Sequence, residues 1–159
     1  MKRYLCILCL ALLAVVATPA DAQNIPIGKR IPDVRPQEWM GGVRPVREAK
    51  LTCIEFFHPS SRRSKSNIES LMALSSGFTH RDFQVVIIAA GDEDAIRTAL
   101  TPYAEEGIAV GIDRGNECFK ALGINYLPAC IIIDDQKKII WTGDSKTLTP
   151  KLIKNLNQK

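Results

Sequence analysis

The sequence predicts an α/β domain in which helices cover a partly parallel sheet that ends in an antiparallel hairpin. Strand-like and helix-like runs alternate along most of the chain, and only a short polar loop separates the last two strand-like runs. With 159 residues, 46% hydrophobic and 24% charged, the chain is long enough for one domain with its own core. This composition excludes a disordered tail, and the net charge of +4, spread along the chain, does not indicate nucleic-acid binding.

The first 22 residues have the features of a secretory signal peptide. A basic start at residues 1–3 precedes an apolar run over 5–16, and small residues stand before a cleavage point at Gln23. The apolar run is shorter than the ~20 residues that a membrane-spanning helix needs. We therefore expect a signal peptide at 1–22 and one domain at 23–159, periplasmic in a Gram-negative cell and otherwise secreted, with no membrane span after cleavage.

The sequence contains five cysteines, which is too few for a disulfide-dense mini-protein. Cys6 and Cys9 lie in the apolar run of the signal peptide and leave with it, whereas Cys53, Cys118 and Cys130 remain in the domain. An odd number of thiols means that at least one is unpaired or bonds to another molecule.

The first half of the domain is expected to contain an extension, a strand and a helix. Residues 23–50 are rich in proline and glycine, which is typical of a turn-rich lead-in with short edge strands. A β-branched and aromatic run predicts a strand over 51–57, bounded by His58-Pro59-Ser60. Apolar residues at helical spacing over 68–74 predict a helix that ends at Gly77.

The second half continues the alternation and closes it with a hairpin. The apolar run over 83–90 predicts a buried central strand, and Asp92 can cap a helix that ends near Gly107. The remaining elements are expected to be a strand at 108–112, a helix at 117–122, hairpin strands at 129–133 and 138–141, and a final helix that begins after Thr149 with Pro150 at its first position.

This order of elements also predicts where a functional site would lie. Ligands of such sheets bind outside the carboxyl ends of the strands. In this chain, that rule indicates residues 58–65, which follow the strand at 51–57 and open the next helix.

Four parts of the sequence match one known family in order and spacing: the lead-in at 28–33, the strand and helix start at 54–57 and 61–64, the segment at 122–129, and the closing hairpin at 131–143. In these parts the chain resembles exported thioredoxin-fold proteins of the TlpA/ResA thiol–disulfide oxidoreductase type. The resemblance implies a thioredoxin-like fold, with a central mixed sheet flanked by helices and a turn-rich N-terminal extension. It also implies a cis-proline at Pro128.

The chain departs from this family at the redox motif. Where the family has Cys-x-x-Cys, the sequence reads Ser61-Arg62-Arg63-Ser64. Disulfide exchange needs one thiolate to attack and a second thiol to resolve the mixed disulfide. The chain as written therefore cannot perform dithiol chemistry at this site, and Ser61 is expected to serve as a helix N-cap.

None of the three remaining cysteines takes the place of the missing pair. Cys53, inside a strand, and Cys118, beside Phe119, are expected to pack as small buried hydrophobes. Cys130 lies closest to the site, and the strand register of the family places it opposite Phe56. A bridge between Cys53 and Cys130 is therefore not expected, and a single-thiol redox role for Cys130 is kept as a third hypothesis.

The helix start still offers a site for binding. Free backbone amides, two hydroxyls and two guanidinium groups form a cluster that attracts anions. The resemblance adds the cis-proline segment, at which the family pairs with extended peptides. The candidate binding residues are Ser61, Arg62, Arg63, Ser64, Leu127 and Pro128. The plainer interpretation of this cluster is a solvated basic face.

Other chemistries lack support in the sequence. His58 stands three residues before Ser61, but no Gly-x-Ser-x-Gly elbow and no nearby acid accompany the pair. The acidic run at 92–94 lacks the pattern of a calcium loop and suits the first turn of a helix. No His, Cys or acidic residues show the spacing of metal ligands, so no metal or cofactor is expected.

The leading functional hypothesis is an exported thioredoxin-like domain with a degenerate, redox-inactive motif that binds a peptide, a protein partner or an anionic ligand. The alternative is a thiol–disulfide oxidoreductase of the TlpA/ResA type whose two active-site cysteines are seen as Ser61 and Ser64. An assay of disulfide reduction with the chain as written and with both serines changed to cysteine separates the two hypotheses.

Overall fold

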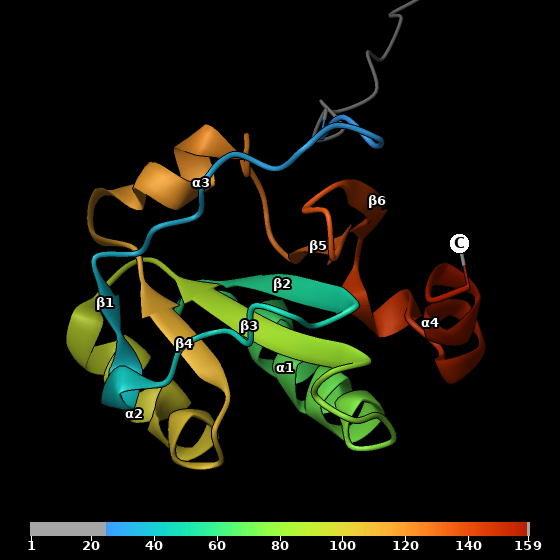
Figure 1. Ribbon diagram of the computed structural model, residues 1–159. Coiled ribbons are helices and arrows are strands. Elements are labelled where there is room, and N and C mark those ends of the chain that lie inside the picture. Colours follow the sequence, from blue (N-terminus) through green and yellow to red (C-terminus); the bar gives the residue numbers. More distant parts are fainter. Residues whose placement is uncertain (1–24, 159) are drawn as a thin grey trace, which may run out of the picture.

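A six-stranded mixed sheet forms the centre of the computed structural model, which describes residues 25–158 (Figure 1). The strands are β1 (Glu38–Trp39), β2 (Leu51–Phe57), β3 (Phe83–Ala89), β4 (Ala109–Ile112), β5 (Ala129–Asp134) and β6 (Ile139–Gly143). Their order in the sheet is β1-β4-β3-β2-β5-β6. The pairs β2–β3 and β3–β4 are parallel, and the other neighbours are antiparallel. The signal peptide predicted at 1–22 lies outside the described residues.

The helices are α1 (Arg62–Ser75), α2 (Glu93–Glu105), α3 (Glu117–Ala121) and α4 (Pro150–Leu156). Three of them begin at the caps that the sequence predicts: the side chains of Ser61, Asp92 and Thr149 each accept a hydrogen bond from a backbone N–H in the first turn. The predicted elements are therefore present, with ends that differ by one or two residues.

The two faces of the sheet are covered differently. Helices α1, α2 and α4 lie on one face, and α3 with the N-terminal lead-in lies on the other (Figure 1). Because side chains alternate along a strand, β2 supplies Cys53 and Phe57 to the core under α1, and Ile54 and Phe56 to the core under α3. The aromatic ring of Phe56 meets that of Phe119 edge to face at 5.1 Å.

The register between β2 and β5 corrects one expectation. Cys130 faces Glu55, and Ala129 faces Phe56, so the pairing is one residue away from the expected position of Cys130 opposite Phe56. A slip of one residue moves every side chain of a strand to the other face. Cys130 consequently lies on the same face of the sheet as Cys53, which the expected register excludes.

The lead-in packs closely against the sheet where a proline ring meets a glycine of β4. Pro36 is buried against Gly111 of β4, and a Cβ added at Gly111 would overlap the proline ring. The Gln37 N–H donates to the Ile112 carbonyl next to this contact.

Among residues 25–158, no helix has the length and apolar character needed to cross a membrane.

Candidate functional site

The start of α1 carries two serines in direct contact. The Ser61 hydroxyl accepts hydrogen bonds from the Ser64 backbone N–H at 3.2 Å and from the Ser64 hydroxyl at 2.9 Å. Ser64 is fully buried and Ser61 is half-buried. The two positions at which the resemblance implies thiols therefore hold a hydrogen-bonded pair of hydroxyls, which caps the helix and cannot be oxidised to a bridge.

The arginines between these serines point to solvent. Arg62 and Arg63 are exposed, and neither has a partner within the described part of the chain. Lys65 is exposed on the same turn, and the first turn of α1 contains no acidic residue. The helix start thus presents unpaired positive charge, in a place where the helix dipole favours negative charge.

A groove lies beside Ser61, between the end of β2 and the loop that leads to β5. It has a volume of about 450 Å³ and is lined by His58, Ser60, Ser61, Phe119, Ile124, Asn125, Tyr126 and Leu127. The Leu127–Pro128 peptide bond at its edge is cis, and Tyr126 is 50% exposed. Of the six predicted binding residues, Ser61 and Leu127 line the groove; Ser64 is buried beneath it, Pro128 follows Leu127, and Arg62 and Arg63 lie outside the lining.

The His58 ring makes its hydrogen bonds with Ser60, and Ser61 bonds to His58 only through its backbone N–H, which donates to the His58 carbonyl at 2.9 Å. The Nδ1 atom lies 2.7 Å from the Ser60 hydroxyl and accepts from the Ser60 backbone N–H at 3.3 Å. On the other side, a Cβ at Gly91 would come within 2.7 Å of Nε2, so that position accepts only glycine. No carboxylate orients the ring among the described residues, so the nucleophile-activating triad that a hydrolase needs is not formed.

A buried carboxyl group lies in β2, and sequence reasoning did not single it out. Glu55 is 0% exposed, and neither of its oxygens has a hydrogen-bond partner within residues 25–158. Its polar neighbours bond to one another: the Asn67 amide donates to Asp144 at 2.6 Å and to Ser145 at 3.1 Å. Burial raises the pKa of Glu55 to about 8. Weak contacts to Ser145 and Cys130 act in the opposite direction and offset only part of this effect. The sequence signal that could have identified Glu55 is an acidic residue inside an otherwise apolar strand.

All three cysteines of the described chain are buried free thiols. Cys118 is on the buried side of α3, and burial followed by the nearby Asp113 carboxylate raises its pKa to about 12. Burial likewise raises the pKa of Cys130 well above its usual value. These properties are the opposite of those of a reactive thiol, which is exposed and has a lowered pKa, so the geometry does not support a single-thiol redox role for Cys130.

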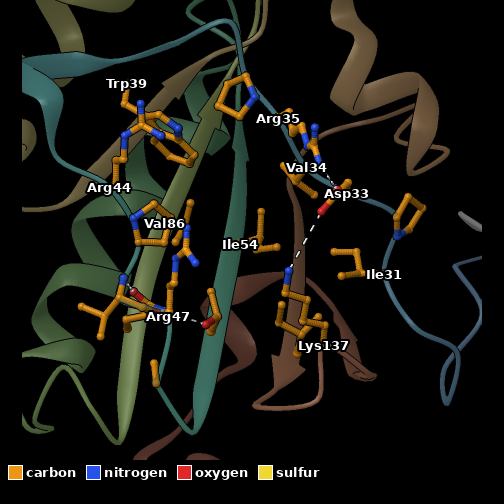
Figure 2. Close-up of a pocket in the computed structure, with 18 of the residues that line it drawn as sticks. Ile31, Asp33, Val34, Arg35, Trp39, Arg44, Arg47, Ile54, Val86 and Lys137 are labelled. Carbon is orange, nitrogen blue, oxygen red and sulfur yellow. Dashed lines mark hydrogen bonds and ion pairs between the residues drawn. The ribbon is translucent and has the colours of Figure 1, made fainter.

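A larger cavity, of about 880 Å³, lies away from this site, between the lead-in and the sheet face that α3 leaves uncovered (Figure 2). Ile54 and Val86 form an apolar floor, whereas Asp33 with Arg35 and Lys137 forms a charged rim. Nothing in the sequence marked this cavity, because it depends on where the lead-in crosses the sheet.

No group of three or more His, Cys, Asp or Glu side chains within 25–158 is placed to hold a metal ion.

Comparison with known proteins agrees with this architecture. No protein-family model and no curated protein sequence matches the chain. The thioredoxin domain of a thiol–disulfide oxidoreductase from Bacteroides vulgatus has a TM-score of 0.67 at 13% identity, covering 82% of this chain and 96% of that one. A thioredoxin-like protein in its oxidised form gives 0.67 at 16% identity, with coverage of 82% and 96%.

A secreted disulfide oxidoreductase from Mycobacterium tuberculosis, homologous to E. coli DsbE, is similar over a smaller region. Its TM-score is 0.53 at 13% identity, covering 69% of this chain and 81% of that one. At these identities the similarity establishes the fold alone. The sheet order, the helices on both faces and the solved structures together show that this chain has the thioredoxin-like fold.

Proposed function

We propose that the protein is an exported, redox-inactive thioredoxin-like domain that binds an extended acidic peptide or protein segment in the groove beside Ser61. The observation that carries this proposal is a groove without a thiol at the place where the fold positions its redox motif. The hydroxyls of Ser61 and Ser64 keep the helix capped there, so the site retains its shape without its chemistry.

The walls of the groove suit a peptide better than a compact ion. Phe119, Ile124 and Leu127 are apolar, and Tyr126 adds an aromatic ring that is half exposed. Tyrosine is one of the residue types that most often carry the binding energy at protein interfaces. The groove is also open to solvent along its length, as binding of an extended segment requires.

The charge beside the groove favours an acidic partner. Arg62 and Arg63 have no ion pair within the described residues, so both guanidinium groups are available to a ligand. An exposed ion pair contributes ~0.2–1 kcal/mol. The two arginines together would therefore lower the Kd of an acidic peptide by about 2- to 30-fold.

A binding assay with labelled peptides tests this proposal. Fluorescence anisotropy with acidic and basic extended peptides should show tighter binding of the acidic ones. The double change Arg62→Gln/Arg63→Gln should weaken that binding, whereas Arg81→Gln, an exposed arginine before the amino end of β3, should leave it unchanged. A free-energy loss from Arg81→Gln about half that from the double change would mean that only net charge matters, and unchanged binding in both would remove the arginines from the site.

The names of the similar structures fit the alternative function, a thiol–disulfide oxidoreductase whose two active-site cysteines are seen in this chain as Ser61 and Ser64. Insulin reduction by the chain as written and by its Ser61→Cys/Ser64→Cys variant decides between them. Turnover by the unchanged chain would refute the redox-inactive proposal. Turnover by the double-cysteine variant alone would show a competent scaffold that lacks only its thiols.

Export is part of the proposal and rests on the signal-peptide pattern at 1–22. One of the similar structures is a secreted protein, which supports the same location. Fractionation of expressing cells, followed by N-terminal sequencing, should find a form that begins at Gln23 outside the cytoplasm. A full-length chain confined to the cytoplasm would contradict it.

A further inference from the structure

Two of the buried cysteines touch each other inside the sheet. The Sγ atoms of Cys53 on β2 and Cys130 on β5 are 3.0 Å apart. Cys53 faces Ile132 and Cys130 faces Glu55, so the two cysteines are diagonal neighbours on one face of an antiparallel pair. Their side chains are 0% and 1% exposed.

The two thiols are in direct contact, and in the reduced chain this contact is a hydrogen bond in which either sulfur can donate. Non-bonded heavy atoms attract one another best at ~3.5–4.0 Å, whereas a disulfide bond is ~2.05 Å long. Diagonal neighbours in an antiparallel pair are on average ~7–8 Å apart at their Cα atoms, yet these sulfurs already meet at 3.0 Å. The sulfur atoms would have to approach by about 1 Å more to reach the length of a disulfide bond, and β2 and β5 would have to bring the two Cα atoms to within ~7 Å of each other.

We propose that Cys53 and Cys130 form a disulfide that joins β2 to β5 when the chain folds in the presence of a disulfide oxidant. Both S–H bonds break and one S–S bond forms, which releases two protons and two electrons. The oxidant is a second disulfide, whose S–S bond breaks as it takes up those two electrons and two protons to become two thiols.

The burial of the pair determines when this reaction takes place. In the folded, reduced protein both thiols are out of reach of a partner, and burial raises the pKa of Cys130, so the reactive thiolate is suppressed. Exchange therefore belongs to the folding chain, before β5 closes on β2. Once formed, the bond is equally inaccessible, which makes it a structural disulfide and not an exchange centre.

The third cysteine of the domain cannot compete for this bond. Cys118 belongs to the core under α3, on the opposite face of the sheet from Cys53 and Cys130. The odd thiol count of the domain is thereby explained as one disulfide and one buried free thiol.

Peptide mapping of the full chain tests this inference, because trypsin separates the three cysteines. Cleavage after Lys50 and Arg62, after Arg114 and Lys120, and after Lys137 leaves Cys53, Cys118 and Cys130 on three different peptides. The reduced chain is refolded from denaturant with glutathione disulfide, alkylated in denaturant and digested without reductant. We expect most of the Cys53 peptide to be recovered joined to the Cys130 peptide, with an intact mass lower by two hydrogens.

Two variants control the assignment. Cys118→Ser should keep the joined peptide, and Cys130→Ser should abolish it and leave Cys53 alkylated or bound to glutathione. Recovery of Cys53 and Cys130 as separate alkylated peptides from the wild-type chain would overturn the proposal, as would a bond from either one to a different cysteine. The wild-type map decides even if a variant does not fold, and its result is independent of peptide binding at the groove.

Discussion

The buried carboxyl group of Glu55 makes the stability of this protein depend on pH in a direction that can be worked out from the structure. Its pKa is raised from 4.5 to about 8 in the folded chain, chiefly by burial, with the charge of Asp144 acting in the same direction. In the unfolded chain the group is in water and keeps an ordinary pKa. Folding therefore favours the protonated form.

The sign of the effect follows from proton linkage. Below pH 4.5 the carboxyl is protonated in both states, so it adds no pH dependence. Between pH 4.5 and 8 the folded state holds a proton that the unfolded state has released, so the free energy of unfolding falls as pH rises. One pKa unit corresponds to about 1.4 kcal/mol, which makes the total loss about 5 kcal/mol, a large share of the ~5–15 kcal/mol that stabilises a typical domain.

Urea unfolding of the reduced protein at a series of pH values measures this loss. Glu55→Gln replaces the carboxyl with a neutral group of the same shape, so the difference in unfolding free energy between wild type and variant isolates Glu55. The variant should be similar to wild type near pH 4.5 and more stable by several kcal/mol near pH 8. Glu69→Gln, an exposed change on α1, should follow the wild-type profile. If the unfolding free energies of wild type and Glu55→Gln changed with pH in the same way, the conclusion that Glu55 is buried without a partner would be refuted.

Three further outcomes can be measured with the same unfolding assay. Ser61→Ala removes the side-chain cap of α1 and should lower the unfolding free energy by ~0.5–2 kcal/mol. Gly111→Ala drives a Cβ into the Pro36 ring and should lower the unfolding free energy by ~1–3 kcal/mol as the lead-in is displaced from β4, and wild-type stability of this variant would contradict the close contact. The pKa of Glu93 is lowered to about 2, and the largest cause is its hydrogen bonds from Arg114, which Arg114→Gln breaks. Since a lowered carboxyl pKa stabilises above pH 4.5 and is lost toward pH 2, the variant should lose stability at pH 7 but not at pH 2, and high salt should shrink the difference.

The parts of this fold that could be predicted from the sequence are those set by local chemistry. Ser61, Asp92 and Thr149 cap helices because a hydroxyl or carboxylate followed by a helical pattern satisfies the first backbone amides wherever the helix lies. The position of the site, after β2 and at the start of α1, follows from the alternation of strands and helices. Neither conclusion needs a long-range contact.

The parts that could not be predicted depend on how distant segments meet. Whether Cys130 faces Phe56 or Glu55 is decided by one residue of register between strands that lie far apart in the sequence, and the apolar run of β5 suits either choice. The cavity under the lead-in depends on the crossing of Pro36 over Gly111, which no local pattern encodes. Errors of this kind leave every element correct and still misplace the pairs of side chains that carry chemistry.

Within residues 25–158, the cysteines that could be oxidised are buried in the two cores, whereas the start of α1 holds Ser61 and Ser64. The hydroxyls of Ser61 and Ser64 bond to each other, and in the described part of the chain neither bonds to Glu55. Across the strand pair, Glu55 faces Cys130, whose sulfur meets that of Cys53. The disulfide proposed above would join β2 to β5 in the core under α1, whereas the groove proposed to bind a peptide lies beside Ser61 and has no cysteine in its lining.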